Sequence, residues 1–192
     1  MKFAPLIIIV SSALLGCASN QPTKPGYPEV YRLALSEFQG TNDVADQSIE
    51  EFSAFLSNLG AADSAQRAAQ LYAPTLHFSD SLMHTRDRDD VVTHFQGLVD
   101  AETQVQVQML QTLVSGPDVY LVWSMQSQFT PIRKTVTSDS IGITHLRFNQ
   151  QGQVIMHQDF WDTGQGFYQH VPVLGRVIRS INNRFVPEES AP

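Results

Sequence analysis

The sequence has one cysteine, Cys17, among its 192 residues. The chain therefore forms no intrachain disulfide, and its stability has to come from a hydrophobic core. It also has no run of lysines or arginines, and its formal net charge is −7. Because phosphate groups are bound mainly by clustered Lys and Arg, we expect neither nucleic acid binding nor electrostatic docking on anionic lipid.

The motifs of several enzyme classes are missing as well. There is no glycine-rich phosphate loop, no Gly-x-Ser-x-Gly nucleophile motif and no His-Glu-x-x-His metal motif. The six histidines lack the paired spacing of zinc ligands. The sequence therefore predicts a protein that works without a metal or an organic cofactor.

Residues 1–17 have the layout of an export signal. Lys2 supplies a short positive start, residues 3–15 are mostly apolar, and the small residue Gly16 precedes Cys17. The apolar run is shorter than the roughly 20 residues needed to cross a bilayer, so a signal peptide is predicted instead of a membrane span.

This segment resembles the lipobox of bacterial lipoproteins. The resemblance implies removal of residues 1–16, a diacylglyceryl group on the thiol of Cys17, and acylation of the new amino terminus with a fatty acid such as palmitate. Ala18 and Ser19 follow the cysteine, and the absence of Asp there resembles outer-membrane sorting. We therefore expect a lipid-anchored protein of the cell envelope, in the outer membrane and facing the periplasm. The alternative is an ordinary secretory signal with an incidental cysteine.

The remaining length suits one domain with extensions at both ends. Residues 17–43 are predicted to be a lipid-anchored tether, because they are rich in proline and polar residues, although the second half is apolar enough to pack on the domain. Residues 44–165 form the predicted domain, residues 166–185 a C-terminal helix and residues 186–192 a tail. The C-terminal helix is amphipathic, and its alternative roles are packing on its own domain, covering a pocket, pairing in a dimer or lying on the membrane.

Within the domain the hydrophobic pattern changes from a helical to a strand period. Apolar residues recur at helical spacing over residues 49–59, 63–72 and 87–98, and a short strand is predicted over residues 75–79. Asp87 and Asp90 resemble a capping box at the start of the third helix. Alternation of apolar and polar residues follows over residues 105–113, 119–129, 140–148 and 154–161. This order predicts an α+β fold with helices packed against one curved antiparallel sheet.

Several short pieces of the domain, taken in order, resemble the SnoaL-like and ketosteroid-isomerase-like branch of the nuclear transport factor 2-like superfamily, over roughly residues 45–165. The pieces are Leu71-Tyr72-Ala73, Phe78-Ser79-Asp80, the strand from Ile143 to Phe148, Gly152 and His157-Gln158-Asp159-Phe160-Trp161. The resemblance implies a cone in which a bent sheet wraps around helices and encloses one apolar pocket. It also implies a homodimer through the open face of the sheet, for which Val119, Leu121 and Trp123 are the expected apolar strand residues.

The resemblance places Asp80 at the general base of the isomerase branch, and Phe78, Thr144 and Trp161 at the pocket. A carboxylate in a partly apolar pocket is expected to have a raised pKa. Thr144 stands where that branch has a protonated Asp, and a phenylalanine, Phe55 or Phe52, stands where it has a Tyr. Without these two oxyanion donors, ketosteroid isomerisation is not expected.

Strand alternation adds two residues to this site. His157, Asp159 and Trp161 share one face of the last strand, so all three are predicted to line the pocket. Asp80 or His157 is then the expected base and Asp159 the orienting group, unless His157 and Asp159 form a purely structural pair or Asp159 and Asp162 cap the next helix. Two functions stay open: binding of a small apolar ligand or a partner protein, or a cofactor-free SnoaL-like enzyme of isomerase, cyclase or hydrolase type.

Overall fold

A computed structural model describes residues 25–185 of the chain. The predicted signal peptide 1–16, the lipidation site Cys17, the start of the tether and the tail 186–192 lie outside the described residues. Among residues 25–185, no helix has the length and apolar character that a membrane crossing requires.

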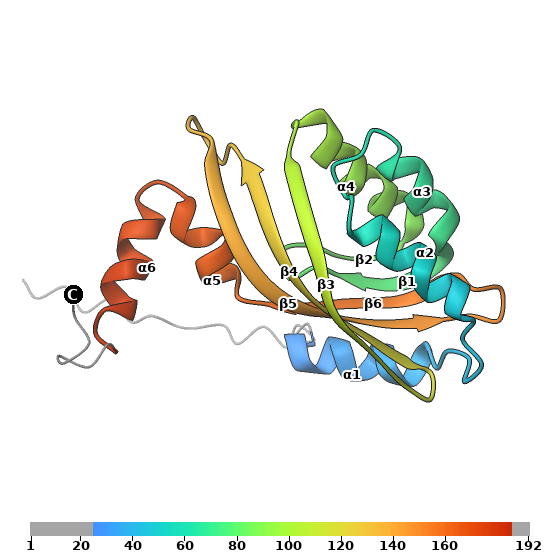
Figure 1. The fold of residues 1–192 in the computed structure, drawn as a ribbon. Coiled ribbons are helices and arrows are strands. Elements are labelled where there is room, and N and C mark those ends of the chain that lie inside the picture. Colours follow the sequence, from blue (N-terminus) through green and yellow to red (C-terminus); the bar gives the residue numbers. More distant parts are fainter. Residues whose placement is uncertain (1–24, 186–192) are drawn as a thin grey trace, which may run out of the picture.

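Six strands form one curved, open sheet (Figure 1). Their order across the sheet is β2-β1-β6-β5-β4-β3. The strands are β1 (Tyr72–Ser79), β2 (His84–Asp87), β3 (Gln104–Ser115), β4 (Asp118–Phe129), β5 (Val136–Phe148) and β6 (Val154–Trp161). The three long strands β3, β4 and β5 follow one another as hairpins, because short turns join them. The predicted α+β class with a curved sheet is confirmed.

The sheet is mixed, whereas the sequence pattern predicted an antiparallel one. β1 pairs with β6 in the parallel direction, with Phe78 opposite His157, and every other neighbouring pair is antiparallel. A parallel pair needs a long crossover connection, and here the chain between β1 and β6 contains a helix and four strands. This pairing brings the end of β1 next to the end of β6.

Three helices cover the concave face of the sheet: α2 (Asp46–Leu56), α3 (Ser64–Leu71) and α4 (Arg88–Asp100) (Figure 1). The helix start at Asp87 is confirmed, because its side chain accepts a hydrogen bond from the N–H of Asp89. The capping box is not completed. Asp90 instead accepts a hydrogen bond from the hydroxyl of Thr85 at 2.5 Å, which fixes α4 to β2.

The hydrophobic core lies between these helices and the sheet. Phe52 and Phe55 of α2 are fully buried against Tyr72 of β1, with edge-to-face ring contacts at 5.8 and 6.3 Å. Such aromatic packing supplies the stability that a chain without disulfides requires.

The strand residues expected on the open face belong to this core. Val119, Leu121 and Trp123 are at most 2% exposed, because the alternation of β4 turns them toward the helices. The opposite, convex face carries other apolar side chains, among them Ile141 of β5 (63% exposed) and Phe160 of β6 (39%). The homodimer stays a prediction, and its contact surface would be this convex face.

Helix α1 (Tyr27–Glu37) lies on the convex face, inside the segment predicted as a tether (Figure 1). The hydroxyl of Tyr31 is 2.9 Å from Nδ1 of His145, and its ring contacts Phe160 edge to face at 5.4 Å. Arg147 donates to the backbone carbonyls of Leu35 and Phe38 at 2.7 and 3.0 Å. The second half of the segment therefore packs on the domain.

The chain after β6 forms α5 (Thr163–Gly166), a short 3-10 helix, η1 (Tyr168–His170), and α6 (Leu174–Asn182). Asp162 caps α5 by accepting from the N–H of Gln165 at 3.0 Å. The C-terminal helix predicted over residues 166–185 is shorter in the structure, because α6 covers only Leu174–Asn182, and its main neighbour is η1. Figure 1 shows α6 standing beyond the end of the sheet, away from α2, α3 and α4.

Candidate functional site

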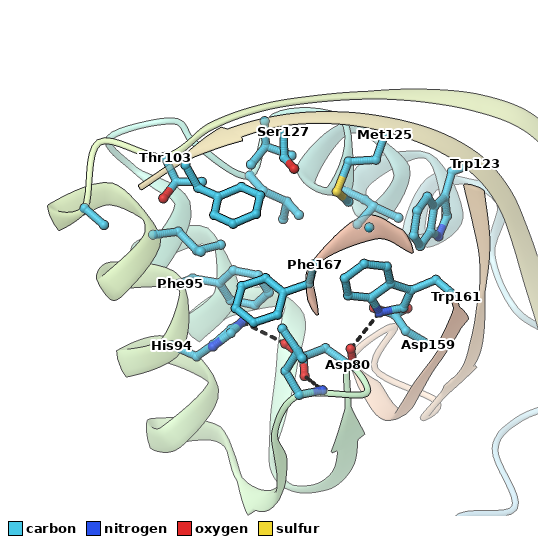
Figure 2. A pocket seen from close by; sticks show the side chains of 18 of the residues that line it. Asp80, His94, Phe95, Thr103, Trp123, Met125, Ser127, Asp159, Trp161 and Phe167 are labelled. Atoms are coloured by element: carbon cyan, nitrogen blue, oxygen red, sulfur yellow. Dashed lines mark hydrogen bonds and ion pairs between the residues drawn. The ribbon is translucent and has the colours of Figure 1, made fainter. Parts of the chain in front are cut away.

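A cavity of about 370 Å³ lies between the concave face of the sheet and the helices that cover it. Its wall is mainly apolar, with Leu98 of α4, Met125 of β4 and Phe167 at the end of α5 among the lining side chains (Figure 2). The volume falls in the range of pockets that bind small molecules. Two of the predicted pocket residues, Phe78 and Trp161, line this cavity.

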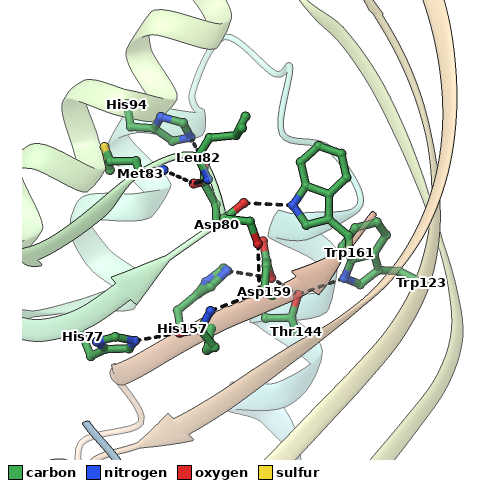
Figure 3. Close-up of polar contacts among 12 residues, drawn as sticks. His77, Asp80, Leu82, Met83, His94, Trp123, Thr144, His157, Asp159 and Trp161 are labelled. Atoms are coloured by element: carbon green, nitrogen blue, oxygen red, sulfur yellow. Dashed lines mark hydrogen bonds and ion pairs between the residues drawn. The ribbon is translucent and has the colours of Figure 1, made fainter. Parts of the chain in front are cut away.

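The three residues predicted to carry chemistry, Asp80, His157 and Asp159, also line this cavity. The parallel pairing of β1 with β6 brings them together, although they are nearly 80 residues apart in the sequence. Two bonds hold the ends of the strands in place. The indole N–H of Trp161 donates to the carbonyl of Asp80 at 2.8 Å, and the hydroxyl of Ser81 donates to the carbonyl of Asp159 at 3.2 Å (Figure 3).

Asp159 is held by two side-chain donors on the same oxygen. Its Oδ1 lies 3.0 Å from Nε2 of His157 and accepts from the hydroxyl of Thr144 at 2.6 Å. Thr144 in turn accepts from the indole N–H of Trp123 at 2.9 Å. Thr144 is therefore buried behind the cavity wall. The prediction that it lines the cavity is wrong. Among residues 25–185, no donor reaches the second oxygen, Oδ2, of Asp159.

The ring of His157 lies between two hydrogen-bond partners. A carboxylate only accepts hydrogen bonds, so the Nε2–H group of His157 donates to Asp159. The other ring nitrogen, Nδ1, lies 2.8 Å from the hydroxyl of Tyr72. Burial, together with the charges of Asp159 and Asp80, raises the pKa of Tyr72 well above its usual value, so the hydroxyl keeps its proton. Both ring nitrogens of His157 therefore have a hydrogen-bond partner, which fixes the orientation of the ring.

Asp80 has a different environment. One oxygen accepts from the N–H groups of Leu82 and Met83 at 2.9 and 2.6 Å, and the other lies 3.1 Å from Nε2 of His94. Burial raises the pKa of Asp80, but the bonds from His94 and the two N–H groups lower it further, so the net pKa is below its usual value. The expected upward shift is wrong, because the site supplies Asp80 with donors that the sequence pattern does not reveal.

Two members of the site were missed in the sequence. His94 projects from α4 into the cavity beside Asp80 (Figure 2). The hydroxyl of Tyr72 is hydrogen-bonded to Nδ1 of His157. His94 lies at helical spacing from Val91 and Leu98 but is polar, and Tyr72 has the pattern of a core aromatic. Helical and strand periods indicate which face a residue occupies, but they do not indicate which side chain from another element will meet it.

A second polar cluster lies on the far side of β1. His77 is 1% exposed, and its Nε2 is 3.0 Å from Oε1 of Gln158, while Nδ1 is 3.3 Å from the ring of His84. Burial lowers the pKa of His77 to about 4. Within residues 25–185, no group of three His, Cys, Asp or Glu side chains is arranged to hold a metal ion.

Comparison with protein families identifies residues 50–157 as a SnoaL-like domain. The matched segment covers more than half of the chain. The protein belongs to the SnoaL-like family. The resemblance noted in the sequence is therefore confirmed for the domain, and a search of curated proteins gave no match to this SnoaL-like chain.

Solved structures of known proteins show the same fold. A SnoaL-like polyketide cyclase from Shewanella denitrificans aligns with a TM-score of 0.54 and 12% identity, over 63% of this chain and 94% of that one. An LEH-like epoxide hydrolase from Mycobacterium tuberculosis aligns with a TM-score of 0.52 and 12% identity, over 76% and 98%. A protein of ketosteroid isomerase-like fold from Catenulispora acidiphila, in complex with trimethylamine, has a TM-score of 0.51 and 11% identity, over 74% and 98%. At these identities the likeness concerns the fold of this SnoaL-like protein and not its activity.

Proposed function

We propose that the cavity binds one small, mainly apolar molecule. The observation that supports this is the cavity itself, with its wall of aromatic and aliphatic side chains and the carboxylates of Asp80 and Asp159 among them. A site of this kind recognises an apolar body by burial and orients it through a few polar contacts. Phe95, Met125 and Trp161 would contact the apolar body, and the polar end would face Asp159.

The cavity can be tested with N-phenyl-1-naphthylamine, an uncharged apolar dye whose fluorescence rises in apolar surroundings. Leu98→Trp adds bulk to a lining residue of α4 and should weaken dye binding about tenfold or more. Leu113→Trp is the matched control, because Leu113 is 47% exposed and does not line the cavity. Equal dye affinity in wild type and Leu98→Trp would show that the dye binds elsewhere and would contradict the proposal.

We further propose that the site transfers a proton without a cofactor, with Asp159 as the base. The free Oδ2 atom of Asp159 supports this role, since the side chain is only 13% exposed and lines the cavity. Thr144 and His157 hold the other oxygen, so the carboxylate is oriented before a substrate arrives. Asp80 is the weaker candidate, because both of its oxygens already accept hydrogen bonds and its pKa is lowered.

We also propose that the protein is anchored in the cell envelope through lipid on Cys17. The support is the sequence of residues 1–17, with its positive start, short apolar run and terminal Gly16–Cys17. Cys17 is the only thiol of the chain and therefore the only acceptor for a thioether-linked lipid.

Labelling of cells with tagged palmitate tests the anchor. The wild-type protein should take up label, and Cys17→Ser should take up none, because the acceptor atom is lost. Ser19→Ala is the control and should be labelled like the wild type. Label on the Cys17→Ser protein would rule out lipidation at this position.

A further inference from the structure

The C-terminal end of the molecule carries apolar side chains that its own fold leaves uncovered. Those of Val173, Leu174, Val177, Ile181 and Phe185 are between 41% and 82% exposed. They lie on or next to one face of α6, which stands at the edge of the molecule (Figure 1). The start of α6 is fixed to η1, because Gly175 is buried where a Cβ atom would collide with the carbonyl group of Gln169.

Within residues 25–185, this end also carries positive charge without a carboxylate partner. Between residues 163 and 187 the sequence has three arginines and no Asp or Glu. The loop after β4 adds two more cations at the same end, because the ring of Phe129 stacks on Phe167 at 5.5 Å. Among residues 25–185, these five side chains have no carboxylate within 4.0 Å. They are Arg133, Lys134, Arg176, Arg179 and Arg184.

The other arginines of the described part behave differently. Arg32, Arg86, Arg88 and Arg147 each have a carboxylate partner, and Arg67 lies over the ring of Phe55. The cations without a carboxylate partner therefore belong to two segments at one end of the molecule, residues 173–185 and the loop 130–135, which we together call the C-terminal surface. The sequence analysis expected no docking on anionic lipid, because the net charge of the whole chain is −7. The local charge of this surface is positive, and at physiological salt the local charge decides the attraction.

We propose that the C-terminal surface docks on a membrane that contains anionic lipid. An amphipathic helix with an exposed apolar face and arginines on its polar side binds at the boundary of headgroups and acyl chains, and its positive charge attracts anionic lipid. Ile132, which is 59% exposed in the loop 130–135, adds a further apolar contact. A second copy of the chain is a poorer partner, because pairing of the same surfaces would bring like charges together.

Docking would also place the cavity next to the bilayer. Phe129, Pro131 and Phe167 line the cavity wall and lie beside the C-terminal surface. A small apolar ligand dissolved in the membrane would then reach the cavity over a short path. The docking proposal does not depend on this, since it rests on the exposed apolar side chains and on the cations that have no carboxylate partner among residues 25–185.

A fluorescent label on either side of α6 tests the proposal in the full chain. In a Cys17→Ser background, Ile181→Cys places the environment-sensitive dye NBD on the apolar face, and Asn183→Cys places it on the opposite side. With vesicles of phosphatidylcholine and phosphatidylglycerol, the dye at position 181 should brighten several-fold and shift to the blue, while the dye at position 183 should change little. Vesicles of phosphatidylcholine alone should give a weaker response.

Two further results distinguish the partners. Replacing both Arg176 and Arg179 by Gln should reduce the response at position 181, and so should added salt. No response at position 181, or an equal response at positions 181 and 183, would overturn the proposal. A response at position 181 that depends on protein concentration in the absence of vesicles would also overturn it, in favour of a second copy of the chain.

Discussion

Asp159→Asn should lower the rate of proton abstraction in the cavity by about 10²-fold or more, the usual contribution of a placed general base. A suitable probe is 5-nitrobenzisoxazole, a small apolar aromatic compound that needs only a base. The carboxylate takes the proton from the ring C–H, the electron pair of that bond forms the nitrile, and the N–O bond breaks to release a coloured phenolate. Wild-type protein should convert it faster than the same concentration of acetate does.

Two other variants make this experiment specific. Asp139→Asn removes an exposed carboxylate that accepts from Gln126 outside the cavity, so the rate should stay at the wild-type value. Asp80→Asn should lower the rate less than Asp159→Asn, because the oxygens of Asp80 are already occupied. If Asp80→Asn abolishes the reaction and Asp159→Asn does not, Asp80 is the base. Thermal melts of each variant establish that the rate change does not reflect unfolding.

The protein should lose about 3 kcal/mol of its free energy of unfolding between pH 6.5 and pH 4 through His77 alone. Burial lowers the pKa of His77 from 6.5 to about 4 in the folded state. Between these values the unfolded chain binds a proton that the folded chain does not, so stability falls as the pH is lowered through this window. A difference of 2.5 pKa units corresponds to about 3 kcal/mol.

His77→Gln tests this contribution, since glutamine does not titrate and can keep the hydrogen bond to Gln158. Urea unfolding of the variant at the two pH values should show a loss smaller by about 3 kcal/mol than in the wild type. His84→Gln should have a smaller effect, because His84 is exposed. The carboxylates with lowered pKa, such as Asp80 and Asp118, lose most of their contribution below pH 3.8, and they do so equally in the variant and the wild type. The same acid loss in His77→Gln and wild type would contradict the assignment.

Much of the fold follows from hydrophobic periodicity. The spacing of Ile49, Phe52 and Phe55 predicts the buried face of α2, and the alternation of His157, Asp159 and Trp161 predicts the cavity-facing side of β6. Each of these patterns is local, because a residue and its neighbours in one element decide which side is apolar. Alternation does not predict which set of strand residues faces the helices, because it cannot distinguish the concave from the convex face of the sheet. Val119 and Leu121 were expected on the open face and are buried under the helices.

The parts that were not predicted depend on contacts between distant elements. One example is the parallel pairing of β1 with β6. Others are the contacts of His94 with Asp80 and of Tyr72 with His157. These contacts result from packing and leave no periodic signal in the sequence. The pKa of Asp80 is the clearest case. Its apolar surroundings favour a raised pKa, and donors from α4 and from the turn after β1 reverse that direction.

The central claim is that the cavity holds a small apolar molecule beside Asp159. A crystal structure of the protein with N-phenyl-1-naphthylamine tests it most directly. We predict one dye molecule inside the cavity, in contact with Phe95, Met125 and Trp161 and within reach of the carboxylate of Asp159. A dye molecule bound only at the convex face or on α6, with the cavity empty, would contradict the claim.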